Sequence, residues 1–268
     1  MFIRHGLKSL TDLTDPFDSH CSLRAGSDRL THVMKTHRFI VDVRLAKGLI
    51  TVQDESLARQ MASVLKLKTG ETVVLSDGQG SEAKGTIARL DKKSAVVDLG
   101  EPGVCAIEPE RKVVLCCAIL KRENFEWVVQ KATEVGVGKI VPLITDRTVK
   151  QSLKTERLHL IAKEAAEQSG RCRVPEIIQP MTLSEALAEA DVDRKLFFHV
   201  GTPQESKTPT VNDDPIKIFV GPEGGWTDAE VDLAKNKGCL VQGLGDLALR
   251  GETAAVCASF VAVNGLRW

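Results

Sequence analysis

The order of apolar and polar residues changes character near residue 110. Before that point, apolar and β-branched residues occur in short runs separated by glycine-containing turns, which is typical of a β-rich domain. The runs that predict strands are 39–43, 49–52, 72–76, 85–90 and 95–98. The stretch 55–65 instead has helical spacing, and Asp54 before it is a residue type that caps helices. Short strands at this spacing predict a small barrel.

Beyond residue 110, apolar runs alternate with amphipathic stretches of helical period. Strands are predicted at 112–119, 139–143, 177–178, 195–200, 216–220 and 240–244. Helices are predicted at 123–135, 155–168, 183–190, 228–236 and 252–264. This alternation indicates an α/β domain with a mostly parallel sheet. We therefore place a β-rich domain at 36–108 and an α/β domain at 109–268, after an extension at 1–35 that has no sustained apolar period.

Composition is that of an ordinary globular protein, but charge is distributed unevenly. The 268 residues include 36 Lys and Arg against 36 Asp and Glu, and this balance excludes a uniformly basic nucleic-acid binder. Residues 1–109 carry a net charge of +1, residues 110–175 carry +5 and residues 176–268 carry −6. Several cations of the middle stretch fall in loops. The sequence therefore allows two interpretations of this stretch: a patch that faces phosphates, or an ordinary solvated surface. No run approaches the ~18 apolar residues that span a bilayer, so we expect no membrane segment.

Seven cysteines are scattered along the chain without a CxxC pair, and six histidines occur without an HxxxH pair. The odd count and irregular spacing of the cysteines favour reduced thiols. We therefore expect a reducing compartment and a cytoplasmic location. The same residues show no spacing typical of a zinc site, so we expect no bound metal.

Two loops carry the residues best suited to ligand binding. The first, Gly221 to Gly225 with the sequence Gly-Pro-Glu-Gly-Gly, directly follows the strand predicted at 216–220. Ligands of open α/β sheets bind at the carboxyl ends of strands, and glycines let a ligand approach the backbone closely. The spacing matches neither GxGxxG nor a P-loop. The local sequence is therefore consistent with either of two roles for residues 221–225: a ligand-binding loop, or a tight turn between a strand and a helix.

The second loop begins at Leu244, again after a predicted strand and before a helix. Leu247 and Leu249 fit no core period there and would suit a flat heterocycle such as adenine. For Arg250 two roles are open: contact with an anionic substrate, or an ion pair with an acid such as Glu252 or Glu223. Glu252 lies at the start of the helix, where the helix dipole favours a carboxylate.

Together the two loops resemble those of the knotted SPOUT-class RNA methyltransferases, in particular the RsmE family of 16S ribosomal RNA (uracil-N3)-methyltransferases. Further segments are similar to the family pattern: 121–127, 130–137, 142–147, 164–171, Pro175 and His37-Arg38-Phe39. The resemblance covers about residues 36–268, and the combination of motifs is specific. The chain departs from the family at Lys66, where the family has arginine, and at Gly251, where it has a larger residue.

The resemblance implies a PUA-like β-barrel that binds RNA and a trefoil-knotted α/β domain that binds S-adenosylmethionine and forms a homodimer. The donor would lie against the two loops and the segment after a third strand: His199, Val200, Gly201, Val220, Gly221, Pro222, Glu223, Gly224, Gly225, Leu244, Gly245 and Leu249. Basic residues of both domains would bind phosphates: Arg38, Lys66, Lys121, Arg122, Arg147 and Arg171. The implied partner is 16S ribosomal RNA within the 30S subunit.

The implied reaction is methyl transfer to N3 of a specific uridine in the decoding region of that RNA. We expect Arg250 to hold uracil or its developing N3 anion, and Glu252 to be the nearest candidate base. The alternative for Glu252 is a structural role at the helix start. Two other functions stay open: a SPOUT methyltransferase acting on another RNA or on a ribose 2′-hydroxyl, and a non-catalytic RNA-binding assembly factor.

Overall fold

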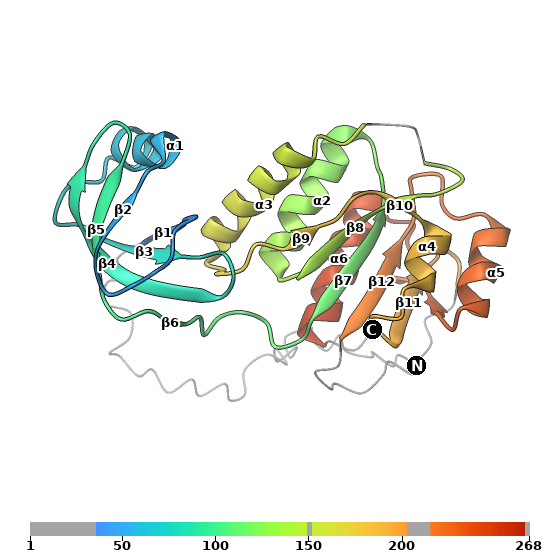
Figure 1. The fold of residues 1–268 in the computed structure, drawn as a ribbon. Helices are drawn as coiled ribbons and strands as arrows, with labels where there is room; N and C mark the ends of the chain where they lie inside the picture. Colours follow the sequence, from blue (N-terminus) through green and yellow to red (C-terminus); the bar gives the residue numbers. More distant parts are fainter. Residues whose placement is uncertain (1–35, 149–151, 203–214, 266–268) are drawn as a thin grey trace, which may run out of the picture. The chain divides into compact units, whose positions relative to one another are not determined.

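The computed structural model describes residues 36–148, 152–202 and 215–265, apart from the side chain of Arg122, and these residues build two sheets (Figure 1). The strands up to Val104 belong to the first sheet, and those from Val113 onward belong to the second. Each sheet has its own apolar core. Within the described residues, no helix combines the length and apolarity that crossing a bilayer demands.

The first sheet is largely antiparallel. Its strands are β1 (His37–Ile40), β2 (Gly48–Val52), β3 (Thr72–Ser76), β4 (Ser81–Leu90), β5 (Ala95–Leu99) and β6 (Gly103–Val104). In space they follow the order β1-β3-β4-β5-β2, with β6 paired to β4 and with β1 parallel to β3. Buried side chains of β4 such as Ile87 meet Phe39, Leu75 and Val97 in one core. Closure of this sheet into a barrel stays a prediction.

The helix predicted at 55–65 is present in two parts. The first, α1 (Glu55–Arg59), begins after Asp54, whose carboxylate accepts a hydrogen bond from Leu57 N at 3.0 Å. The predicted N-cap is therefore confirmed. The chain continues as a π-helical turn, η1 (Gln60–Val64). Shortly after it, Lys66 adopts φ = 57°, a left-handed conformation that is uncommon for a residue with a side chain.

The second sheet is parallel throughout its described strands. These are β7 (Val113–Ala118), β8 (Lys139–Ile144), β9 (Glu176–Ile177), β10 (Met181–Thr182), β11 (Arg194–Phe198), β12 (Ile216–Val220) and β13 (Leu240–Gln242). Their order is β10-β8-β7-β12-β11-β13, and β9 also pairs with β8. All residues of β7 and β12 are buried, because these central strands are covered on both faces. The α/β prediction with a mostly parallel sheet is confirmed.

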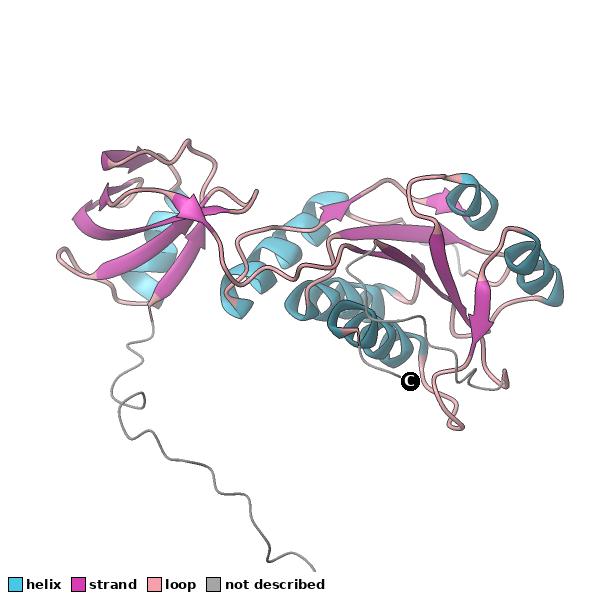
Figure 2. Cartoon of the chain, turned by 90° about the horizontal axis from the view of Figure 1, so that it is seen from below, coloured by secondary structure: helices cyan, strands magenta, loops and turns pink. Residues whose placement is uncertain are grey.

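Helices cover both faces of this sheet (Figure 2). The helices α2 (Arg122–Val135), α3 (Thr155–Ser169) and α6 (Gly251–Asn264) pack with one core cluster, which includes Leu115 and Ile218 of the central strands. The short helices α4 (Leu183–Ala188) and α5 (Asp228–Asn236) pack with the other cluster, which includes Phe197 and Phe219. The threonines predicted to precede α4 and α5 both cap them through complete capping boxes.

The predicted element bounds agree with the structure to within a few residues, and the differences concern short or terminal segments. The two-residue strand β9 overlaps the strand predicted at 177–178, whereas β6 and β10, also of two residues, were not predicted. The strands β11 and β13 end at Phe198 and Gln242, two residues earlier than predicted. This shortening assigns 199–200 and 243–244 to the loops that follow these strands.

The prediction that all seven cysteines are reduced thiols is wrong for one pair. Cys105 and Cys172 form a disulfide although 67 residues separate them in sequence. Cys105 lies in the linker between β6 and β7 (residues 105–112), and Cys172 lies in the loop after α3. The fold brings the two sulfurs together, and the spacing of cysteines along the chain cannot predict such a contact. The remaining described cysteines are free thiols: Cys116, Cys117, Cys239 and Cys257. The seventh, Cys21, lies outside the described residues.

A buried lysine ties the centre of the second sheet to the loop before β11. Lys217 on β12 has no exposed side-chain surface, and its Nζ donates to Glu189 Oε2 at 2.9 Å and to Asp191 Oδ1 at 2.5 Å. The two carboxylates remain about one-third exposed. Partial burial opposes ionisation of Asp191, but the hydrogen bond and charge of Lys217 outweigh it and lower the pKa of Asp191.

This ion pair predicts a loss of stability in acid. Because the pKa of Asp191 is lower in the folded chain, its contribution is complete above its unfolded value of about 3.9 and disappears as the pH falls through the folded value. The variant Lys217→Met is expected to lose about 1–3 kcal/mol of unfolding free energy at pH 7. It is also expected to lose less further stability than the wild type between pH 5 and 3. Urea unfolding at several pH values measures both effects, and parallel pH curves for the two proteins would contradict the assignment.

Candidate functional site

A cavity of about 690 Å³ opens where strands of the second sheet end. Because β11 lies between β12 and β13 and all three run parallel, the loops that follow them meet at one edge of the sheet. Residues of the segments 198–200, 220–226 and 244–252 line the cavity, together with Lys121, Asn124, Arg147 and Ala254. It thus gathers every predicted donor-binding residue except Gly201, which lies in the turn just beyond His199 and Val200.

The first glycine loop is anchored by its own tryptophan. Trp226 is buried, and its Nε1 donates to Phe198 O at 2.9 Å. A Cβ on Gly221 would approach Trp226 to 2.9 Å, so a larger residue at that position would force the ring to move. Gly225 adopts φ = 69° and donates its N–H to Pro222 O at 2.9 Å, which closes a tight turn. The loop is therefore both a tight strand-to-helix turn and a wall of the cavity.

Arg147, predicted to contact RNA phosphates, binds this loop in the structure. Its Nη1 donates to Gly224 O at 2.7 Å and to Trp226 O at 3.2 Å. The neighbouring Asp146 carboxylate accepts a hydrogen bond from the hydroxyl of Thr227, the N-cap of α5, at 3.2 Å. The loop after β8 is thereby tied to the loop after β12. The side chain of Arg147 is exposed, but one of its nitrogens holds the backbone of the cavity wall.

The second loop combines an open backbone with apolar side chains. Gly245 has φ = 105°, and a Cβ there would meet no atom within 4 Å. Leu247 is 80% exposed at the cavity, while Leu249 is partly buried. At the start of α6, a Cβ on Gly251 would lie 3.0 Å from Leu120, so the helix begins in close contact with the segment after β7. This loop therefore gives the cavity a wall whose backbone is accessible at Gly245 and whose side chains are apolar at Leu247 and Leu249.

Arg250 and Glu252 both line the cavity, at the N-terminus of α6. The side chain of Arg250 is exposed and forms no ion pair with Glu252 or Glu223 within the described residues, so that predicted alternative is not found. Oε2 of Glu252 is buried and has no hydrogen-bond partner in the described part of the chain. Leaving such an atom unpaired costs about 1–3 kcal/mol, so its position favours a polar group that enters the cavity.

A cysteine next to the cavity is excluded as a nucleophile. Cys117 on β7 is the register partner of Val220, the last residue of β12 before the first glycine loop. Burial raises the pKa of the Cys117 thiol far above its ordinary value, and the charge of Glu223 raises it further. The thiol therefore stays protonated and unreactive. Glu223 itself accepts a hydrogen bond from the backbone N–H of Lys121 at 3.1 Å, which links the loop after β7 to the first glycine loop.

Arg171, predicted to bind RNA phosphates, has its guanidinium buried among protein groups in the structure. Its side chain is only 6% exposed, and its Nη1 donates to Thr133 O at 2.9 Å and to Val137 O at 2.8 Å. The same guanidinium forms an ion pair with Glu108 at 3.0 Å. These partners fix the end of α2 and the linker, so Arg171 is a buried structural residue.

The other predicted phosphate-binding residues differ in their surroundings. Arg38 pairs with Glu82 and is 16% exposed, so most of its guanidinium faces protein. Lys66 and Lys121 are exposed on the first sheet's domain and at the start of α2, respectively. The side chain of Arg122 lies outside the described residues. The exposed cations that remain for a phosphate contact are therefore fewer than the sequence indicated.

Leu247, singled out in the sequence as a surface for a flat heterocycle, lines the cavity, whereas several other residues of its wall were not predicted: Asn124, Phe198, Trp226, Ala248, Gly251 and Ala254. Most of them directly adjoin predicted residues, so the loops themselves carried the signal. Asn124 is different, because it belongs to α2 and reaches the cavity only since β7 and β12 are neighbours. The described residues hold one group of three metal-ligating side chains, Glu82 with Cys105 and Cys172, and none of these lines the cavity.

Two family models match the chain. Residues 108–262 match the RNA methyltransferase domain, and residues 61–100 match the RNA methyltransferase PUA domain. Among curated proteins, the chain is 31% identical to ribosomal RNA small subunit methyltransferase E of Rickettsia conorii over 84% of this chain and 94% of that protein. It is 29% identical to the protein of the same name from Bacillus subtilis, over 74% of this chain and 83% of that protein.

Solved structures give the same picture. A putative methyltransferase from Legionella pneumophila, in complex with S-adenosylmethionine, is 31% identical with a TM-score of 0.78, covering 86% of this chain and 98% of that one. Ribosomal RNA small subunit methyltransferase E of Neisseria gonorrhoeae, bound to the same molecule, is 28% identical with a TM-score of 0.78, covering 84% and 95%. The similarity therefore spans both sheets.

Proposed function

The chain belongs to the ribosomal RNA small subunit methyltransferase E family, and we propose that it methylates N3 of one uridine in the decoding region of 16S ribosomal RNA. It is an S-adenosylmethionine-dependent methyltransferase of small-subunit ribosomal RNA. The observation that carries the proposal is the cavity, in which three loops, each following a parallel strand, meet with Arg250 and Glu252 at its wall.

The residues of the cavity suit the methyl donor. The backbone at Gly225 and Gly245 is unobstructed, and Leu244 and Leu249 offer apolar surface for a flat base. The unpartnered Oε2 of Glu252 provides a buried acceptor. When bound, S-adenosylmethionine supplies a methyl group on a cationic sulfonium. The chain's own part is to hold that group in line with the nucleophile, an orientation effect worth up to about 7–11 kcal/mol.

We assign the chemistry of the nucleophile to Arg250 and Glu252. Uracil N3 carries a proton and attacks poorly until it is lost, so the site needs a base or a cation that stabilises the N3 anion. Arg250 lines the cavity and has no side-chain partner within the described residues. Lys121 and Arg147 also line it, but Arg147 is bound to carbonyls of the first glycine loop. Glu252 is the candidate proton acceptor. Because N3 is paired inside a duplex, the uridine must be unpaired or flipped out.

Three further parts of the proposal concern RNA and assembly. The first sheet, expected to close as a PUA-like barrel, binds RNA in the context of the 30S subunit. The second domain is expected to be knotted around the cavity and to act as a homodimer. Support for dimerisation comes from α6, which is apolar overall and yet exposes Phe260 to 47% and also exposes Cys257. We also propose that the enzyme acts in the cytoplasm, where ribosomal subunits are found.

Lys66 provides a test of RNA binding by the first sheet. It is exposed and holds φ = 57°, where glycine is preferred at a helix end. We expect Lys66→Gly to raise the unfolding free energy by about 0.5–1 kcal/mol, because the left-handed conformation no longer costs side-chain strain. The same variant is expected to bind RNA more weakly and to lower the salt slope of binding by about one.

Denaturant unfolding and filter binding between 50 and 200 mM salt measure these two effects. The matched control is Lys66→Gln, which removes the charge but keeps the strained backbone. That variant is expected to lose RNA affinity without gaining stability. A glycine variant that is more stable and binds RNA as well as the wild type would show that Lys66 does not touch RNA.

The proposed function is tested by incubating the chain with labelled S-adenosylmethionine and 30S subunits, then analysing the nucleosides by mass spectrometry. The expected product is N3-methyluridine at one position of 16S RNA. A methylated ribose or a methylated transfer RNA would instead support another SPOUT activity. Donor retention without any methylated nucleoside would contradict the proposed reaction, and a chain that retains no donor would be a binding factor only.

A further inference from the structure

We propose that Cys105 and Cys172 form a reversible redox site that controls how tightly the enzyme binds ribosomal RNA. In the oxidised state the disulfide fastens the linker between the two sheets. In the reduced state the linker is held by hydrogen bonds and by the ion pair of Glu108 with Arg171. The inference rests on the proposed function for its RNA substrate, but the redox chemistry of the two sulfurs is independent of it.

The disulfide lies at the point where three segments of the chain meet. The carbonyl of Cys172 accepts hydrogen bonds from Gly80 N at 3.0 Å and from the Ser76 hydroxyl at 3.2 Å, both near the turn between β3 and β4. The linker joins them through Cys105 N, which donates to Gly80 O at 3.0 Å. On the same turn, Gly78 O accepts a hydrogen bond from Val174 N at 3.1 Å. The first sheet is thus attached to the loop after α3 at the disulfide.

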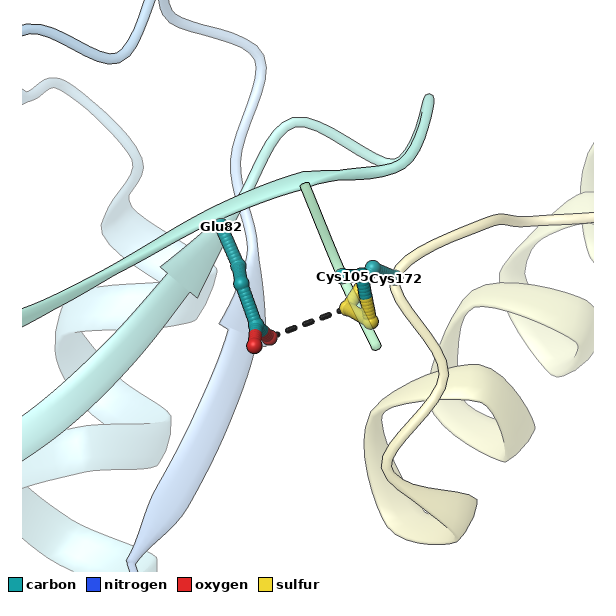
Figure 3. A group of neighbouring side chains, drawn as sticks. All are labelled: Glu82, Cys105 and Cys172. Carbon is teal, nitrogen blue, oxygen red and sulfur yellow. Dashed lines mark hydrogen bonds between the residues drawn. A yellow bond between two sulfur atoms is a disulfide. The ribbon is translucent and has the colours of Figure 1, made fainter. Parts of the chain in front are cut away.

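The surroundings of Cys172 suit a thiol as well as a disulfide. Its Sγ lies 3.0 Å from Glu82 Oε2 and 3.2 Å from Arg38 Nη1. Figure 3 draws the contact between Glu82 and the disulfide as a dashed line. A disulfide sulfur has no proton, and in that state Glu82 is paired with Arg38. After reduction the thiol can donate its proton to Glu82, whose carboxylate lies next to the sulfur. Neither redox state therefore leaves a charged group of this cluster without a partner.

The chemistry of reduction is thiol–disulfide exchange with an external dithiol. A thiolate of the dithiol attacks Cys105 Sγ, the bond between the two protein sulfurs breaks, and Cys172 leaves as a thiolate. The Arg38 cation beside Cys172 Sγ stabilises that leaving group. The second thiol of the dithiol then releases Cys105. The two protons of the dithiol end on Cys105 and Cys172, and the dithiol becomes a disulfide.

Access to the sulfurs comes from the linker. Cys105 is buried, but its neighbours Val104 and Ile107 are 87% and 57% exposed. The linker's regular structure before it is β6, a strand of two residues. A brief opening of so short a strand is enough to expose Cys105, whereas Cys172 is packed beneath the first sheet's turn. This asymmetry selects Cys105 as the sulfur that a dithiol attacks.

The same three side chains place their ligand atoms within 4.8 Å of one another, a spacing that a metal ion also requires. The position of Arg38 argues against that use. A guanidinium 3.2 Å from one sulfur and paired with the carboxylate repels a cation and would have to give up Glu82 first. The cluster therefore favours electron exchange over metal binding.

Opening the disulfide is expected to weaken RNA binding and to leave donor binding unchanged. RNA must contact the first sheet while its target base enters the cavity of the second, so a fixed linker pre-organises the two contacts. The cavity shares no residue with the disulfide cluster. We expect at least a fivefold rise in the Kd for 30S subunits on reduction, a thermal midpoint lower by about 5–10 °C, and an unchanged Kd for S-adenosylmethionine.

The test compares the full-length chain after oxidation and after treatment with dithiothreitol, with the state of each cysteine read by differential alkylation and mass spectrometry. Cys105→Ser and Cys172→Ser are expected to give the reduced-state RNA affinity under both conditions. Cys239→Ala, which removes a free thiol that is remote from the disulfide and from the cavity, is the control and is expected to respond as the wild type does.

A disulfide that withstands dithiothreitol in the folded chain, or equal RNA affinities in the two states, would overturn the proposal. So would stoichiometric zinc binding by the reduced chain that is lost in Cys105→Ser. A methylation assay distinguishes failure of the proposed function from failure of the redox site. If neither state methylates 30S subunits while alkylation still reports both redox states, the assigned reaction is at fault and the redox site stands.

Discussion

Replacing Arg250 with alanine is expected to lower the rate of ribosomal RNA methylation by about 10²–10³-fold while leaving the Kd for S-adenosylmethionine within twofold of the wild type. The reason is the difference between the two substrates. The donor is cationic at the reacting sulfur, so a guanidinium gives no stabilisation at that atom, whereas uracil becomes anionic as N3 loses its proton. Arg250 is the N-cap of α6, lines the cavity and has no side-chain partner within the described residues.

Single-turnover methylation at saturating donor separates the chemical step from binding, and calorimetry gives the donor affinity. Arg250→Lys keeps the charge but loses the planar fork, so an intermediate rate is expected. Arg157→Ala, which removes an exposed arginine of α3 that is paired with Glu126, controls for the general loss of positive charge. A near-normal rate in Arg250→Ala, or a loss confined to donor binding, would refute the assignment.

Regular elements could be read from the sequence because their burial repeats with the period of the element. The helix α5 and the strand β12 have the predicted bounds, and Thr182 and Thr227 cap the helices that follow them. The donor-binding loops could also be predicted. Their residues are contiguous in sequence and follow strands, so one rule about parallel sheets places them at a common edge.

What the sequence could not reveal depends on contacts between elements that are remote along the chain. Arg171 and Arg147 are both arginines in loops of a basic stretch, and nothing local distinguishes them. The first is buried against Glu108 and two helix-end carbonyls, and the second holds the carbonyls of Gly224 and Trp226. Pairing of Cys105 with Cys172 depends in the same way on the order of strands and the path of the linker.

For Arg147 the sequence and the structure make opposite predictions, and the affinity for S-adenosylmethionine decides between them. We expect Arg147→Ala to raise the Kd for S-adenosylmethionine about tenfold, which corresponds to about 1.4 kcal/mol. The Nη1 of Arg147 donates to Gly224 O at 2.7 Å and to Trp226 O at 3.2 Å, and these charge-assisted bonds hold the first glycine loop in one conformation. Without them the loop must be ordered by the donor itself, at a cost in affinity.

The affinity of the same variant for RNA provides the contrast. If Arg147 acts on the loop, its replacement changes the Kd for 30S subunits by less than twofold and leaves the salt slope unchanged, since no phosphate contact is lost. Arg147→Lys is expected to recover part of the donor affinity, because an ammonium can reach one carbonyl but not both with the same geometry. The rate at saturating donor is expected to stay close to that of the wild type.

Together these effects are the opposite of those expected for Arg250→Ala. Weakened RNA binding with normal donor affinity would return Arg147 to the phosphate role that the sequence predicts.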